Sequence, residues 1–213
     1  MNIKAAFVAL PLVLAIASGS LKASPVTFTE SACSVSIVDK PCLFSTEGVQ
    51  YDLTPQGRLH KSAPGGSDST LQLPFTGVTV DRVSFARYGQ DLILICELDD
   101  GESGAGLIVR LDPKLTVMWH LQFPTFNLST GALEDHFLYQ AGFGAIAKVD
   151  LERGVFLWKH EGLYDRKLRT FNAFREPEMG EMEVVFREKI EPKETRSARS
   201  IHVNKITGQM QIE

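Results

Sequence analysis

Apolar stretches separated by short polar turns run along most of the chain, and one arrangement occurs twice between Leu92 and Glu161. In each copy, an apolar strand leads through a loop to a second apolar strand that ends at an Asp. A tight turn then precedes a strand that contains a Trp. The two Asp residues, Asp112 and Asp150, stand about 38 positions apart, near the roughly 40–50 residue period of a propeller blade. The pattern therefore predicts repeated small antiparallel sheets.

The expected strands of the two copies are residues 91–98, 106–112 and 115–121, then 135–141, 145–150 and 155–160. Residues 181–212 repeat the unit more weakly, with Asn204 at the Asp position, Gly208 matching Gly154 and Ile212 in place of Trp158.

Two further segments complete the predicted set of units. Residues 48–60 read as strand, Pro/Gly turn and strand, an early copy without its Trp, and residues 78–85 as an outer strand before the first clear copy. No segment shows a sustained helical period with caps. The sequence thus predicts an all-β domain of about four units, a small four-bladed propeller-like fold that is either closed or open.

The N-terminus has the features of a secretory signal peptide. Lys4 precedes an apolar run over residues 5–17, and small residues follow up to Ala23. The run is shorter than the roughly 20 apolar residues of a membrane-spanning helix. We expect cleavage after Ala17 or Ala23, a domain over residues 24–213, and a periplasmic or otherwise exported protein.

The charge balance argues against nucleic acid as a partner. Without residues 1–23, the chain carries 20 basic and 26 acidic residues, a net charge of −6. Nucleic-acid binding requires a basic surface, which an acidic domain lacks. No basic amphipathic segment indicates a membrane-surface role either.

The three cysteines have different expected roles. Cys33 and Cys42 are close in sequence, and in an oxidising compartment we expect them to form a disulfide. A loop of this length stabilises the fold by about 2–3 kcal/mol on the chain-entropy model. Cys96 alternates with Leu92, Leu94 and Leu98 on an apolar strand, which predicts a buried, unreactive thiol.

The repeated units resemble those of pyrroloquinoline-quinone-dehydrogenase-like propellers, over residues 107–119 and 145–158 and more weakly over 201–212. In that family the Trp docks one blade onto the next, so the resemblance implies this packing role for Trp119 and Trp158. The quinone enzymes use larger propellers with calcium, and this chain offers no counterpart of their active-site residues. We therefore expect no cofactor.

No catalytic or metal-binding pattern stands out in the sequence. Asp99, Asp100 and Glu102 offer carboxylates without regular spacing, and an exposed acidic turn explains them better than a calcium site, which needs six to eight oxygens. His120 and His160 follow the two Trp residues and are expected to share one structural position. No hydrolase or paired-cysteine motif occurs. We expect a protein that is not an enzyme.

Function is therefore expected on the longer loops. If each unit is a blade, residues 99–105, 142–144 and 191–199 emerge on one face, and long loops on a rigid scaffold commonly carry binding. This predicts partner-binding roles for Asp99, Asp100, Glu102, Ser103, Arg196 and Arg199. Solvated hairpin tips without a partner are the alternative.

Residues 85–112 also resemble a segment of the periplasmic immunity proteins that protect bacteria from peptidoglycan amidases delivered by type VI secretion. In that family a Ser-containing loop between two strands plugs the amidase site. The resemblance implies this role for residues 101–105 with Ser103 as the plug, although the family's loop carries paired Ser and this loop has a single Ser.

Together these features predict a non-catalytic exported protein that binds and blocks a partner protein, such as a secreted peptidoglycan hydrolase. One alternative is a structural or assembly scaffold of the cell envelope. Another is a small-ligand-binding β-protein, for which Tyr88, Tyr164, Phe171 and Phe174 would have to line a cleft.

Overall fold

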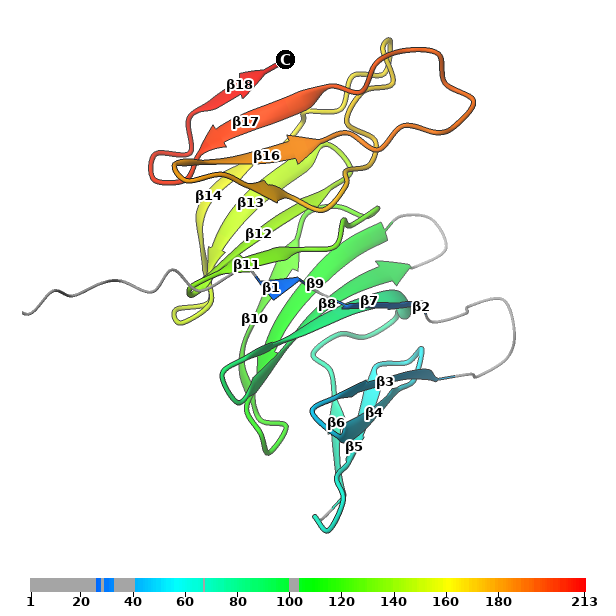
Figure 1. Cartoon of the computed structure of the whole chain (residues 1–213). Coiled ribbons are helices and arrows are strands. Elements are labelled where there is room, and N and C mark those ends of the chain that lie inside the picture. Colours follow the sequence, from blue (N-terminus) through cyan, green and yellow to red (C-terminus); the bar gives the residue numbers. More distant parts are fainter. Residues whose placement is uncertain (1–25, 28, 33–40, 67, 100–103) are drawn as a thin grey trace, which may run out of the picture.

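The structure, a computed structural model, describes residues 26–27, 29–32, 41–66, 68–99 and 104–213. These residues form strands and turns, and none of them is helical. The strands make four antiparallel sheets, numbered I to IV along the chain, which are stacked one on the next like propeller blades (Figure 1). The predicted all-β class and the four units are confirmed.

Each sheet is an up-and-down meander whose neighbours in sequence are neighbours in space. Sheet I contains β3 (Cys42–Thr46), β4 (Val49–Leu53), β5 (Arg58–Ser62) and β6 (Ser69–Gln72). Sheet II contains β7 (Thr79–Tyr88), β8 (Asp91–Asp99), β9 (Gly104–Leu111) and β10 (Val117–Phe123). Sheet III contains β11 (Ala132–Glu134), β12 (Phe137–Gly142), β13 (Ala145–Asp150) and β14 (Val155–His160). Sheet IV contains β15 (Glu178–Met179), β16 (Glu183–Arg187), β17 (Ser200–Asn204) and β18 (Met210–Ile212).

Two short N-terminal strands extend the middle sheets. β1 (Val26–Thr27) pairs with β11 of sheet III, and β2 (Thr29–Ala32) pairs with β7 of sheet II. The segment over residues 78–85 was predicted to be an outer strand. That prediction is wrong, because β2 pairs along the side of β7 that β8 leaves open.

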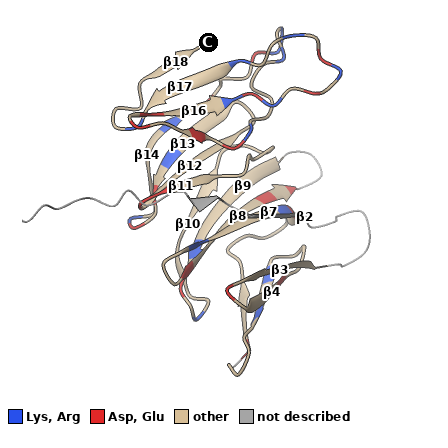
Figure 2. Cartoon of the chain, viewed as in Figure 1, with Lys and Arg blue, Asp and Glu red and all other residues tan. Residues whose placement is uncertain are grey.

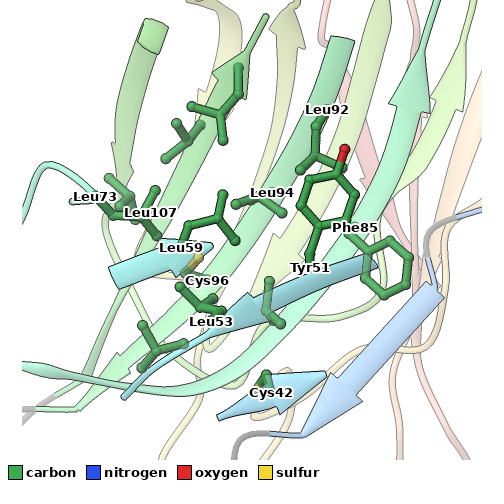
Figure 3. Close-up of a cluster of buried hydrophobic side chains, with 14 of the residues drawn as sticks. Cys42, Tyr51, Leu53, Leu59, Leu73, Phe85, Leu92, Leu94, Cys96 and Leu107 are labelled. Carbon is green, nitrogen blue, oxygen red and sulfur yellow. The ribbon is translucent and has the colours of Figure 1, made fainter. Parts of the chain in front are cut away.

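The hydrophobic core consists of three clusters, one between each pair of successive sheets. On β8, Leu92, Leu94 and Cys96 point toward sheet I, while Ile93 and Ile95 point toward sheet III. Both faces of the strand are therefore buried, since alternate side chains of a strand point to opposite faces. Figure 3 shows Leu94 and Cys96 among the side chains of sheet I, such as Leu53 and Leu59, and the predicted burial of Cys96 is confirmed.

The stack is open at its two ends. Among the described residues, no apolar cluster joins sheet I to sheet IV. Polar side chains lie on the outer faces of both end sheets, beside an exposed Leu43 on sheet I. His60 contacts the hydroxyl of Thr70 on sheet I, and His202 lies between the carboxylates of Glu183 and Glu213 on sheet IV. Terminal repeats with polar outer faces are what a stack needs to remain soluble.

Each Trp docks onto the turn of the next sheet, as the resemblance to the propeller family implied. The ring of Trp119 lies against Gly154, where a Cβ would come within 2.5 Å of a ring carbon, and its Nε1 donates to the Leu151 carbonyl at 2.8 Å. The ring of Trp158 lies in the same way on Gly208 of sheet IV, with a Cβ distance of 2.8 Å. The predicted packing role of both Trp residues is confirmed.

A cationic side chain reinforces every junction. Arg110 donates to the Leu151 carbonyl at 2.7 Å, and Lys148 donates to the Lys205 carbonyl at 2.8 Å. Lys61 of sheet I donates in the same way to the carbonyl of Pro113. Each acceptor directly follows the Asp or Asn that opens the turn of the next sheet, so the three junctions share one design.

The early unit was assigned to the wrong pair of strands. The turn over residues 54–57 joins β4 and β5, the second and third strands of sheet I, whereas the Asp150 turn joins the third and fourth strands of sheet III. The turn of sheet I that matches the Asp150 turn begins at Ala63, which has no side-chain oxygen to cap it. The missing Asp explains why the sequence pattern did not reveal it.

Candidate partner-binding surface

The predicted binding loop of sheet II is described only at its two ends. Asp99 is exposed at the end of β8 and pairs with Gly104 at the start of β9. Asp100, Glu102 and Ser103 lie outside the described residues, so their predicted roles stay predictions. The pairing of Asp99 with Gly104 shows that β8 and β9 form a regular ladder up to the base of this loop.

The predicted binding residues of sheet IV are engaged within the molecule. The Arg196 guanidinium binds both carboxylate oxygens of Glu188 at 2.6 and 2.7 Å, and Glu188 is fully buried. Arg199 lies over the ring of Phe171, and its backbone N–H faces Glu188. Basic and acidic residues alternate along this connection (Figure 2). Arg196 therefore holds the loop in place, whatever role the loop has toward a partner.

Two further predictions fall outside the described part of the chain. Cys33 and the signal peptide over residues 1–23 are not among the described residues, so the disulfide and the export signal remain predictions. Cys42 is buried at the start of β3, and Cys96 is a free thiol whose burial raises its pKa to about 12. A thiol of that pKa is unreactive at neutral pH.

The connector that leaves each of the first three sheets crosses the hairpin between the second and third strands of the same sheet. In each case an aromatic side chain covers a glycine that has no room for a Cβ: Phe75 on Gly57, Phe126 on Gly104 and Tyr164 on Gly144. The connector thus contacts each of these hairpins from one side, in sheet II at the start of β9. The ends of β8 and β9 near residues 100–103 lie on the same side of the stack as the β16–β17 connection (Figure 1).

A pocket of about 430 Å³ opens beside the β8–β9 hairpin. One wall is the connector between sheets I and II, and the other is the end of sheet II. The lining is mainly apolar, with a few polar groups at the rim: Pro74, Phe75, Val78, Leu98, Leu107 and Leu121, with His120 and Gln122. The pocket therefore adjoins the base of the loop in which binding was predicted.

Acidic side chains dominate the β7–β8 side of this hairpin. Glu97 is neutralised by Arg82 at 2.6 Å and also accepts the backbone N–H of Asn127. Asp81 and Asp99 are both exposed. Partial burial, followed by the charges of Glu97 and Asp99, raises the pKa of Asp81. A cationic group of a partner would relieve this repulsion.

The two histidines that follow the Trp residues do not share one position. His160 bonds to the Gly208 carbonyl at 2.8 Å and packs beside Trp158, whereas His120 is exposed at the rim of the pocket. The prediction of a shared position is wrong, because His120 follows its Trp by one residue and His160 by two. Alternate residues of a strand point to opposite faces.

The aromatic residues of the ligand-binding alternative do not meet in one cleft. Phe171 and Phe174 are buried and stacked at 5.7 Å in the core between sheets III and IV. Tyr88 packs on Arg110, while Tyr164 lines a separate pocket of about 260 Å³ with Phe143. The small-ligand-binding alternative required these four aromatic side chains to line one cleft, and the structure does not bring them together.

The pocket and its lining were not predicted from the sequence. Its only local sign is the run Gly104-Ala105-Gly106 at the start of an otherwise apolar strand, since small residues in a strand mark close approach of other groups. The far wall comes from residues 74–78, whose position depends on the packing of sheet I. His120 was considered, but only as part of a repeated structural position.

Two other kinds of site are absent from the part of the chain that the structure describes. No group of three or more His, Cys, Asp or Glu side chains there could hold a metal ion. No helix there has the length and apolar character needed to cross a membrane.

No family model matches the chain, and no curated protein matches it. Among solved structures, it is similar to BamB from Moraxella catarrhalis, with 13% identity and a TM-score of 0.47, over 89% of this chain and 67% of that one. It is also similar to a protein of unknown function from Bacteroides caccae, with 6% identity and a TM-score of 0.41, over 88% and 73% of the two chains. Similarities at this level assign no function to the chain.

Proposed function

We propose that this protein is a non-catalytic, exported binding protein that recognises another protein at the end of sheet II. The observation that carries the proposal is the apolar pocket beside the β8–β9 hairpin, on the rim of which Leu98 and Gly104 flank the loop. Apolar pockets with a few convergent polar groups are the usual form of a binding site.

The hairpin is well suited to present a loop to a partner. Both β8 and β9 are buried strands, and Phe126 and Phe123 fix Gly104 and Gly106 from the sheet III side. A loop on such a base is ordered at its ends before binding, which lowers the entropy lost on association. This favours the finer proposal that the loop blocks the site of a cell-wall hydrolase, as in an immunity protein.

A loop replacement tests the finer proposal. Because Asp99 and Gly104 are paired, residues 100–103 can be replaced by Asn-Gly, which closes two-residue hairpins. We expect residues 24–213 to slow the release of fragments from purified peptidoglycan by a peptidoglycan amidase, and the shortened variant to lose this inhibition. Gln90→Lys, in the turn at the other end of β8, serves as the control and should inhibit normally.

The outcomes separate the two protein-binding functions. Equal inhibition by the intact and shortened proteins would rule out the loop as the blocking element. If the intact protein inhibits no amidase but is crosslinked to envelope proteins in its cell of origin, the envelope scaffold becomes the better proposal. The open stack favours that second function, because it leaves the polar faces of sheets I and IV accessible at the same time as sheet II.

A further inference from the structure

The outermost strands of the four sheets differ in how well they are protected. β6 and β18 have only four and three residues. β14 has six residues and carries Lys159, which is paired with Glu161. β10 is the longest at seven residues, Val-Met-Trp-His-Leu-Gln-Phe, and contains no Lys, Arg, Asp, Glu or Pro.

Unprotected edge strands are templates for pairing with another chain. Short length, charged side chains, Pro and bulges are the usual defences. A bulge is present only at the start of β10, between Val117 and Trp119, and pairing with β9 is regular from Trp119 to Phe123. Along those five residues, every second residue directs its backbone N–H and C=O away from β9, and no strand of the described chain pairs there.

The pocket lies beside this edge. His120, Leu121 and Gln122 of β10 belong to its lining, together with Ala105 and Leu107 of β9. A strand added alongside β10 would bring every second side chain to the face of sheet II on which Leu107 and Leu98 contact the sheet I core. An apolar side chain beside His120 would then enter the pocket.

We propose that an extended segment of the partner pairs with β10 as a sixth strand of sheet II, with one apolar side chain of that segment in the pocket. Main-chain pairing gives affinity in this mode, and the pocket gives specificity. The mainly apolar lining of the pocket favours a segment with an apolar residue at the position beside His120. This inference rests on the proposed binding function and specifies the kind of segment that is bound.

A designed peptide tests the pairing directly. The probe is a fluorescein-labelled heptapeptide, Lys-Thr-Leu-Thr-Leu-Thr-Lys, and its binding to residues 24–213 is measured by fluorescence anisotropy. We expect saturable binding, with slowed amide hydrogen exchange at alternate residues of β10. N-methylation of alternate residues removes the backbone N–H donors along one edge of the peptide. Two methylated peptides, one for each edge, are compared, because either edge of the peptide could face β10. At least one should bind about tenfold more weakly.

Pocket variants test the side-chain part. Ala105→Phe fills the pocket and should weaken peptide binding about tenfold, and Ala105→Val, a smaller change, should weaken it less. Leu157→Phe on β14 is the matched control and should leave the affinity unchanged. Thermal unfolding of each variant shows whether the fold is retained.

Three results would overturn the inference: no peptide binding, undiminished binding of both methylated peptides, or a dimer of the protein paired through β10 in sedimentation equilibrium. None of these affects the amidase assay with the shortened loop. A protein that blocks an amidase through residues 100–103 but ignores the peptide would keep its proposed function and lose the strand-pairing mode.

Discussion

The junctions inside the stack and the two ends of the stack use the same positions of the repeat in different ways. At the junction of sheets II and III, Trp119 and Arg110 both bond to the carbonyl of Leu151. On sheet IV the corresponding positions hold Gln211, which is exposed and pairs with His202, and His202 itself, which faces Glu183 and Glu213. Ile212 was predicted at the Trp position, and that prediction is wrong, because Ile212 pairs with Ile201 on the face toward sheet III. The ends of the stack are therefore distinguished by their side chains, while the strand order stays the same.

The turns that accept docking side chains from the preceding sheet also differ from the matching turn of sheet I, onto which no described sheet docks. Asp112, Asp150 and Asn204 each cap their turn by accepting backbone N–H groups on a side-chain oxygen. Ala63 of sheet I has no such oxygen, and Gly65 of its turn has no atom within 4 Å of a Cβ position. The docking contacts, more than the meander of strands in each sheet, therefore determine where the stack continues.

The largest effect is expected from removing a docking Trp. Trp119→Ala and Trp158→Ala should each lower the free energy of unfolding by about 3–5 kcal/mol, because a large packed ring is lost together with its indole hydrogen bond. Urea unfolding followed by circular dichroism measures this. Gln211→Ala, at the matching position of the end sheet, should change it by about 0.5 kcal/mol or less. A similar loss for all three variants would remove the distinction between junctions and ends.

Breaking the Glu188–Arg196 pair tests whether the β16–β17 connection, which lies away from the junctions, has its own anchor. Arg196→Ala should lower the free energy of unfolding by about 3 kcal/mol, because it leaves a fully buried carboxylate unpaired. Burial raises the pKa of Glu188, but the bonds from Arg196 and from the backbone of Phe171 and Arg199 outweigh it and lower the pKa overall.

The sign of the pH dependence follows from that lowered pKa. Glu188 stabilises the folded state above the pKa of the unfolded carboxyl, and this stabilisation is lost as the pH falls through the folded pKa. Wild type and Glu188→Gln should therefore differ most near neutral pH and converge in acid. A difference that does not shrink below about pH 4 would contradict this account.

Glycine substitutions separate backbone strain from docking. Gly154 and Gly65 have similar φ angles, +65° and +71°, but only Gly154 lies under a Trp ring. Gly65→Ala should cost about 1 kcal/mol from the backbone alone, and Gly154→Ala about 2–3 kcal/mol because the methyl group also displaces Trp119. Equal costs in thermal and urea unfolding would mean that the ring moves aside freely.

The smallest effect concerns the cation at the junction of sheets III and IV. Burial lowers the pKa of Lys148, so the folded protein holds this proton less tightly than the unfolded chain does. The free energy of unfolding should thus rise with pH between the lowered pKa and the ordinary lysine pKa near 10.5. Lys148→Met should lack this rise and differ from wild type by about 1 kcal/mol at neutral pH. Parallel pH profiles for the two proteins would contradict the assignment.

The strand pattern and the Trp–Gly spacing were readable from the sequence because both are local. The alternation of Cys96 with Leu92, Leu94 and Leu98 predicted one buried face of β8. The matched spacing around Asp112 and Asp150 predicted the turns that precede the Trp strands. The strands of sheet I were harder to align with the repeat, because the turn at Ala63 lacks the Asp or Asn that marks the repeat in the other sheets.

The candidate site depended on contacts between segments far apart in the chain. The base of the loop after Asp99 was predicted, but the pocket beside it needs residues 74–78 to lie across the end of sheet II. Arg196 was predicted to bind a partner, and only the folding of its loop places it on Glu188. The sequence by itself therefore determined the strands and the repeat, since hydrophobic periodicity and turn chemistry act over a few residues. The pocket, the unprotected edge of β10 and the partner of Arg196 were decided by the tertiary structure, because they depend on which sheet neighbours which.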